Sequence, residues 1–135
     1  VYGPRGRPDM APFKFLSKIM DGDTIDKYGD GTSYRDYTYI DDIVDGILGA
    51  IRNKNNKTCE VYNLGNSLPH SLNEFIKCCE KVTGKKAIIN QMGDQLRDVP
   101  KTFADITKAK NDLDYSPKIK LDEGLKKMYE WLLTR

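Results

Sequence analysis

The stretch IDDIVDGILGAI constrains the fold most, because its apolar residues repeat with the spacing of an α-helix. The six apolar positions fall at i, i+3, i+4, i+7, i+8 and i+11, namely Ile40, Ile43, Val44, Ile47, Leu48 and Ile51. This spacing gathers them on one face of a helix. The aspartates at the start of the stretch interact favourably with the positive end of the helix dipole. The pattern therefore predicts an amphipathic helix over residues 40–51.

Helical and extended patterns alternate along the rest of the chain. Apolar spacing and end signals predict four more helices, over residues 13–20, 71–84, 104–113 and from about 122 to the C-terminus; Ser71 with Glu74 forms a capping box, and Asp105 is a candidate cap. Extended stretches on both sides of Gly29-Asp30-Gly31 predict a hairpin or a strand with a loop. CEVYNLG predicts a short buried strand ending at Gly65, and KKAIINQM predicts another strand. These elements predict an α/β fold with about five helices in one domain spanning residues 1–135.

Composition narrows the classes of function. The net charge of +2 is spread along the chain, which argues against a nucleic-acid partner. Cys59, Cys78 and Cys79 form no C-x-x-C motif, so we expect reduced thiols and a cytoplasmic location. The single histidine, His70, has no metal-ligating cluster around it, and we expect no metal site. No apolar run is long enough to cross a membrane, so we also expect no membrane partner.

The opening segment VYGPRGRPDMAP is the first of three loops that concentrate arginine, glycine and proline. Arg5 and Arg7 present two guanidinium groups on a backbone restricted by prolines, which suits a carboxylate or a phosphate. A solvated basic loop explains the same composition.

The second loop is SYRDYTYIDD, which leads into the 40–51 helix. Arg35 lies just before this helix, and an arginine there can help helix N–H groups hold a diphosphate. A surface ion pair with Asp36 or Asp41 is the alternative. Tyr28, next to Gly29, can stack against a base or serve as an ordinary core tyrosine.

The third loop is QLRDVP. Arg97 and Asp98 precede Pro100 in this polar stretch. The arginine can contact a phosphate and the carboxylate can accept a hydrogen bond from a sugar hydroxyl. An exposed ion pair is the alternative interpretation.

Taken in order, five stretches resemble the C-terminal half of extended short-chain dehydrogenase/reductases that act on nucleotide sugars. They are VYGPRGRPDMA, RDYTYIDDIVDGI, VYNLGN, ADITKAKNDLDYSP and LDEGLKKMYEWL. The opening stretch is most similar to the strand exit of UDP-glucuronate 4-epimerases. The resemblance implies a substrate-binding lobe of an enzyme that holds NAD and epimerises its sugar at C4.

The resemblance also implies roles for individual residues. Arg35 is expected to bind the UDP diphosphate and Tyr28 to lie against the uracil. Arg5 or Arg7 is expected to meet the glucuronate carboxylate. The expected ribose contact is Asp98, and Arg97 stands where the family more often has glycine. The expected cofactor contact is Tyr2.

Two parts of the family's chemistry are missing from the sequence. The chain has no G-x-x-G-x-x-G turn, since Gly46 and Gly49 match only its first spacing within a helical pattern, and it has no Tyr-x-x-x-Lys pair. We therefore expect a chain that lacks the NAD-binding half, binds no NAD alone and is inactive alone. The alternatives are a nucleotide-sugar-binding module, half of a two-chain enzyme completed by a Rossmann partner, and a folded remnant without a ligand. Exposure of the surface that the missing half would cover predicts low stability or self-association.

Overall fold

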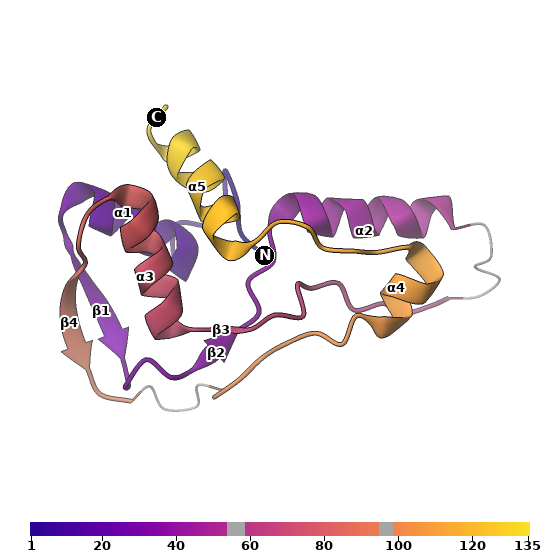
Figure 1. Ribbon diagram of the computed structural model, residues 1–135, viewed down its shortest axis with the longest axis horizontal. Coiled ribbons are helices and arrows are strands. Elements are labelled where there is room, and N and C mark those ends of the chain that lie inside the picture. Colours follow the sequence, from indigo (N-terminus) through magenta and orange to yellow (C-terminus); the bar gives the residue numbers. More distant parts are fainter. Residues whose placement is uncertain (54–58, 95–98) are drawn as a thin grey trace.

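The structure is a computed structural model that describes residues 1–53, 59–94 and 99–135. It consists of a compact body and an arm that extends from it (Figure 1). The body contains α1 (Ala11–Asp21), β1 (Thr24–Tyr28), α3 (Leu72–Thr83), β4 (Ile88–Met92) and α5 (Leu121–Leu132). The arm carries α2 (Ile40–Arg52) and α4 (Thr107–Leu113), and β2 (Tyr34–Arg35) with β3 (His70–Ser71) lies where the two parts meet.

The core of the body forms where α1, α3 and α5 bury their apolar faces together with β1. Its fully buried side chains come from all four elements and include Leu16, Ile19, Ile25, Phe75, Leu125 and Met128. All five predicted helices are present in the described chain. Gly22 follows the last residue of α1 and Gly84 follows that of α3, both in the left-handed conformation that glycine adopts without steric cost.

The start of α3 has the predicted capping box. The Ser71 hydroxyl accepts from the backbone N–H of Glu74 at 3.2 Å, and the Glu74 carboxylate accepts from the backbone N–H of Ser71 at 2.8 Å. The second bond lowers the pKa of Glu74. Because the folded pKa is depressed, this stabilisation is present above the ordinary carboxyl range and is lost as the pH falls through the folded pKa.

The strands pair across long distances in the sequence. Strand β1 pairs in parallel with β4, with Thr24 opposite Ile88 and Tyr28 opposite Met92. Strand β2 pairs antiparallel with β3. The Gly29-Asp30-Gly31 turn is therefore a loop after a strand and does not close a hairpin. The Asp30 carboxylate accepts from both the N–H and the hydroxyl of Thr32, which directs the chain away from β1.

The prediction of a strand at CEVYNLG is wrong. The structure assigns no strand to residues 59–65, and the Val61 side chain is 78% exposed. Only alternate side chains, those of Tyr62 and Leu64, pack against the small core of the arm. A strand needs a neighbour that pairs with its backbone, and no described segment provides one here.

Polar contacts attach the arm to the body. The buried Asp42 carboxylate at the start of α2 accepts from the backbone N–H groups of Lys118 and Ile119 at 2.9 and 3.1 Å. Helix α4 begins at Thr107 and not at Ala104 as predicted. The N–H of Ala104 bonds to the Asp36 carboxylate, while Asp105 accepts from the N–H of Thr107 at the helix start.

Two classes of feature are not found in the part of the chain that the structure describes. None of its helices is long and apolar enough to cross a membrane. The same residues contain no group of three or more metal-ligating side chains.

We expect Ser71→Ala to lower the free energy of unfolding by about 1 kcal/mol, because it removes the acceptor for an N–H at the start of α3. Urea unfolding followed by circular dichroism at pH 7 measures this loss. The exposed Ser116 offers a matched control, and Ser116→Ala is expected to change the free energy by less than about 0.5 kcal/mol. Equal effects of the two substitutions would contradict the role of the cap.

Candidate functional site

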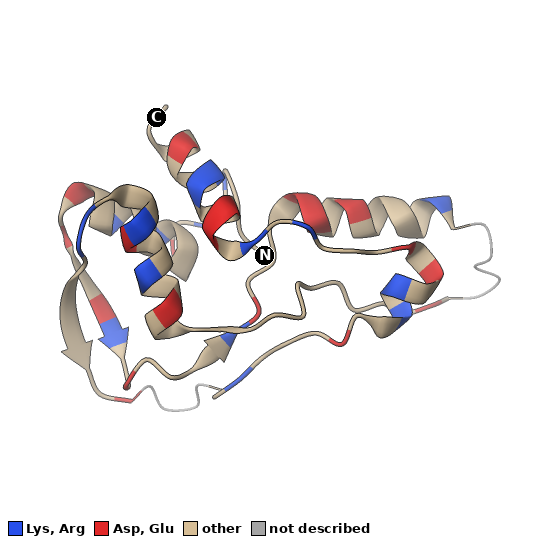
Figure 2. Cartoon of the chain, viewed as in Figure 1, with Lys and Arg blue, Asp and Glu red and all other residues tan. Residues whose placement is uncertain are grey.

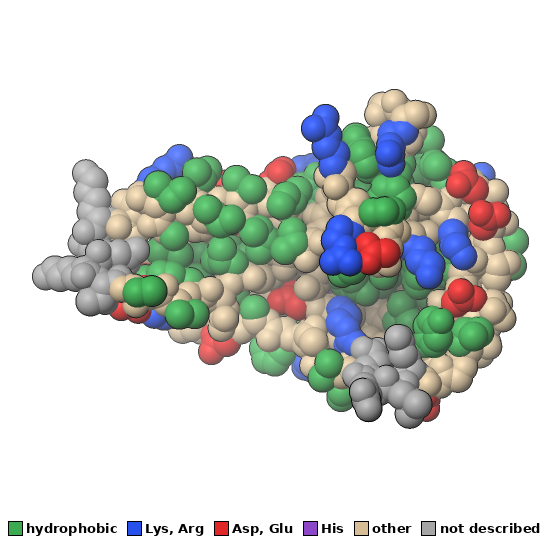
Figure 3. Space-filling view, turned by 180° about the vertical axis from the view of Figure 1, so that it is seen from behind, with side chains coloured by type: hydrophobic (Ala, Val, Ile, Leu, Met, Phe, Trp, Pro, Cys, Tyr) green, Lys and Arg blue, Asp and Glu red, His purple; other side chains and the backbone are tan. Residues whose placement is uncertain are grey.

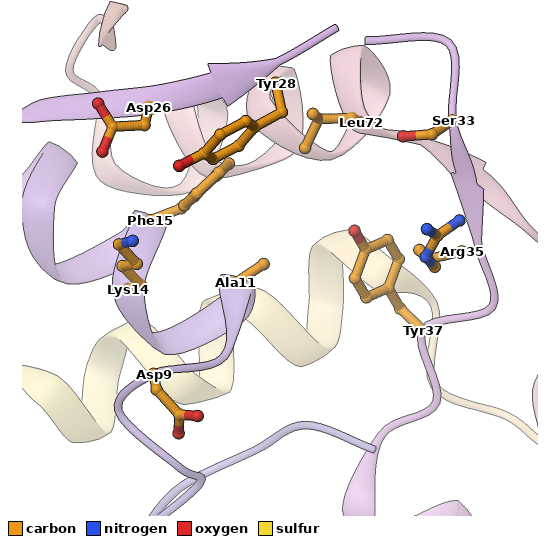
Figure 4. A pocket seen from close by; sticks show the side chains of 10 residues that line it. All are labelled: Asp9, Ala11, Lys14, Phe15, Asp26, Tyr28, Ser33, Arg35, Tyr37 and Leu72. Carbon is orange, nitrogen blue, oxygen red and sulfur yellow. The ribbon is translucent and has the colours of Figure 1, made fainter. Parts of the chain in front are cut away.

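A cavity of about 410 Å³ opens on the body, between α1 and the chain that leads into α2. Its lining comes from four stretches of the chain: Asp9, Ala11, Lys14, Phe15, Asp26, Tyr28, Ser33, Arg35, Tyr37 and Leu72. Figure 4 shows Tyr28 on β1 at one side of this space and Arg35 at another, with the Tyr37 hydroxyl directed between them. Two of the predicted site residues, Tyr28 and Arg35, therefore lie in one cavity.

Arg35 is positioned by the strand pairing at the junction. Its backbone pairs with His70 in β3, and its guanidinium donates to the carbonyl of Tyr34 at 2.7 Å. The backbone of Tyr34 also bonds to Pro100 and Thr102 on its other side. Arg35 is thus presented from a backbone held on two sides, which fixes a cation at the wall of the cavity.

Asp36 connects the cavity wall to the arm. One oxygen of its carboxylate accepts from the backbone N–H groups of Ser67 and Ala104 at 3.0 and 3.2 Å. Three segments distant in sequence therefore meet next to Arg35. We conclude that Asp36 has a structural role beside the cavity.

Tyr28 borders a second, smaller hollow. This space of about 220 Å³ shares Tyr28 and Ser33 with the cavity and is lined further by the 29–32 turn, Asp94, Val99 and Pro100. The Tyr28 side chain is 42% exposed, so it is not a core tyrosine. Tyr28 lines both spaces with a partly exposed ring, which is suited to stacking against a planar group.

Arg5 and Arg7 do not line the cavity, but Arg7 lies at its edge. The Arg7 guanidinium donates to both oxygens of Asp9, at 3.1 and 2.6 Å, and Asp9 lines the cavity. This bonding holds the pKa of Asp9 below its usual value and raises that of Arg7. Arg5 is exposed and has a positive φ of 62°. The Asp9 contact shows that Arg7 is placed to bind a carboxylate at the edge of the cavity.

Tyr2 is part of the core. It is buried, its hydroxyl donates to the carbonyl of Leu121 at 3.2 Å, and its backbone bonds to Thr38 and Ile40. Burial raises the pKa of its hydroxyl. These contacts give the side chain a packing role, and the cofactor contact stays a prediction.

Some predictions lie outside the described residues, and the cavity adds residues that sequence reasoning missed. Arg97 and Asp98 belong to the segment that is not described. Lys14 and Asp26 were missed because each looks like an ordinary polar residue of an amphipathic element. The signal for Tyr37 was its place among the aromatic neighbours of Arg35.

The described residues form no Gly-rich turn of the kind that cradles the phosphates of NAD. The two glycines with part of the required spacing, Gly46 and Gly49, lie within α2. A Cβ at Gly46 would lie 2.7 Å from Leu64, and one at Gly49 would lie 2.9 Å from the carbonyl of Leu113. These glycines allow α2 to pack closely against Leu64 and Leu113 and do not form a phosphate cradle.

Comparison with known proteins places the chain in a family. A model of the GDP-mannose 4,6 dehydratase family matches residues 2–128. The chain belongs to this family. The UDP-glucuronate 4-epimerase of Thermodesulfobacterium geofontis is 42% identical to it over 132 residues, which cover 97% of this chain and 40% of that enzyme. UDP-glucuronate 4-epimerase 2 of Arabidopsis thaliana is 39% identical over 148 residues, which cover 98% of this chain and 34% of that enzyme.

Solved structures give the same result. One match is the UDP-glucuronic acid 4-epimerase of Bacillus cereus in complex with UDP-glucuronic acid and NAD, with a TM-score of 0.92 and 38% sequence identity. The match covers 98% of this chain and 42% of the Bacillus cereus chain. The UDP-glucose 4-epimerase of Thermotoga maritima, with UDP-glucose, has a TM-score of 0.90 and 33% identity, covering 98% and 43%. The predicted resemblance and α/β class are confirmed. This chain corresponds to the C-terminal part of these enzymes and spans less than half of their length.

We expect Arg7→Met to raise the pKa of the Asp9 carboxyl toward its ordinary value of about 3.9, because the guanidinium that stabilises the charged form is removed. An NMR pH titration of the carboxyl carbon measures the shift. Arg5→Met is the matched control from the same loop and is expected to leave this pKa in place. A shift of equal size in both variants would refute the specific pairing.

Proposed function

We propose that this chain is the substrate-binding part of an NAD-dependent UDP-sugar 4-epimerase, and that the whole enzyme interconverts UDP-glucuronate and UDP-galacturonate. The observation that carries the proposal is the cavity that brings Arg35 and Tyr28 together. The named activities and bound ligands of the relatives support it. The free thiols of Cys59, Cys78 and Cys79 suit a cytoplasmic enzyme.

In this proposal the cavity holds the diphosphate of the UDP-sugar. Arg35 bonds to the phosphate oxygens, and Lys14 on the opposite wall adds a second positive charge. The uracil stacks against Tyr28 and extends into the adjoining hollow. Ribose contacts from Asp98, and from Arg97 beside it, remain predictions.

The sugar carboxylate is assigned to the arginines of the opening loop. Arg7 already binds the carboxylate of Asp9 at the edge of the cavity. A glucuronate carboxylate can exchange with Asp9 without leaving a guanidinium unpaired, and the exposed Arg5 lies two residues away. Arg5 and Arg7 are therefore the candidates for binding the carboxylate of an acidic sugar.

In this proposal the chain alone supplies binding and not epimerisation, since its sequence lacks the Tyr-x-x-x-Lys pair and its described residues form no Gly-rich phosphate cradle. The apolar face of α2 indicates where the remaining machinery belongs. Val44, Ile47 and Ile51 are exposed there, and Figure 3 shows hydrophobic side chains gathered along the arm. We assign this face to the NAD-binding part of the epimerase, in the same polypeptide or in a separate chain.

A binding titration tests this role and separates it from that of a remnant without a ligand. UDP is expected to bind saturably to the purified chain in isothermal titration calorimetry. Arg35→Gln is expected to weaken binding at least about tenfold, because a hydrogen-bonded charge contact to phosphate is lost.

Arg52→Gln on the arm is the matched control, since it removes the same charge from an exposed position at the end of α2. It is expected to leave UDP affinity within about twofold. Absence of saturable UDP binding, or equal weakening by both substitutions, would overturn the proposal.

Substitutions on α2 test whether its apolar face serves the fold of this chain. Ile51 is 75% exposed, so Ile51→Ser is expected to change the free energy of unfolding by less than about 0.5 kcal/mol. Leu125→Ala, in the core, is expected to cost about 2–5 kcal/mol. Chemical denaturation measures both, and a cost for Ile51→Ser comparable to that of Leu125→Ala would show that the face is already covered.

A further inference from the structure

Strand β4 has an outer edge without a partner among the described residues. It pairs with β1 along one side only, and it lies at the margin of the body in Figure 1. All five of its residues are exposed, including Ile88, Ile89 and Met92. An exposed apolar edge strand is a template for pairing with another strand.

The backbone of this edge has groups left for pairing. Backbone groups alternate in direction along a strand, so every second residue of β4 directs its N–H and C=O away from β1.

The sequence around β4 is complementary to itself in antiparallel orientation. With Asn90 opposite Asn90 of a second copy, Ile88 lies opposite Met92 and Lys86 opposite Asp94. Figure 2 shows this polarity, with an uncharged β4 preceded by a basic segment and followed by an acidic one. The Ile88–Met92 pairs are thus apolar and the Lys86–Asp94 pairs join a cation to an anion, while Ile89 lies opposite Gln91.

We propose that β4 pairs antiparallel with β4 of a second copy of this chain, centred on Asn90, to form a continuous four-stranded sheet. A register centred on one residue opposes residues whose backbone groups point the same way, so the outward groups of one copy meet those of the other and can exchange hydrogen bonds. The Asn90 side-chain amide already donates to the Asp26 carboxylate of β1 at 2.9 Å, so the two central asparagines and their aspartates would form a line of polar side chains across the sheet.

The charged groups near this edge are compatible with the pairing. Lys86 forms an ion pair with Glu80 of its own chain at 3.3 Å, but its side chain is 90% exposed and can reach a second carboxylate. Lys85 bonds to the carbonyl of Met20. The interface is short, so the dimer is weak and reversible. Its two-fold axis leaves both cavities on one face of the sheet, because Asp26 and Tyr28 line the cavity from that sheet.

Charge reversal tests the register. Sedimentation velocity of the 135-residue chain, from about 5 to 500 µM, covers the affinities expected of a small interface. Lys86→Asp and Asp94→Lys each place like charges opposite one another and are expected to weaken association about tenfold. The double variant restores opposite charges and is expected to recover the affinity of the original chain.

Lys110→Asp in α4 changes the net charge as Lys86→Asp does and is the matched control, expected to leave association unchanged. A chain that stays monomeric up to 500 µM overturns the proposal. Association that both single variants leave intact, or that the double variant fails to recover, also overturns it and assigns self-association to another surface such as the apolar face of α2. UDP binding is measured separately, so failure here leaves the proposed substrate role standing.

Discussion

Packing around Phe75 is the constraint on which the rest of the structure depends. Phe75 on α3 is 0% exposed, and its ring stacks on Tyr37 at 4.5 Å and contacts Phe15 at 5.8 Å between centroids. Both neighbours line the cavity. One buried side chain therefore supports the core between α1 and α3 and two walls of the candidate site, so the shape of the site follows from the formation of the core.

Carboxylates that accept backbone N–H groups hold the less regular parts in place. Asp42 binds the chain that leads to α5, and Asp36 binds two segments of the arm. A backbone donor that leaves water must find an acceptor, and an ionised carboxylate is a strong one. These contacts allow long stretches without regular secondary structure to run beside the cavity in fixed positions.

The helices were predictable because each carries its own periodic pattern and end signals. The spacing of 40–51 and the Ser71 capping box depend on neighbours within a few residues. The strands were harder to predict. A strand is stabilised by a partner that the local sequence does not name, so the hairpin alternative at Gly29 and the strand at CEVYNLG were not realised. For the site, an arginine or tyrosine in a loop shows its chemistry in the sequence but not its neighbours, which is why Lys14 was missed.

The sequence by itself determined the helices, their caps, the α/β class and the family resemblance, because these rest on residue order and short-range periodicity. Only the tertiary structure decided that Tyr28 and Arg35 share a cavity and that Tyr2 is buried. Those relations join segments that approach one another only after α1, α3 and α5 have packed. The physical reason is that hydrophobic burial is non-directional, so the partners of each loop residue are set by the shape of the whole core and not by the residues beside it.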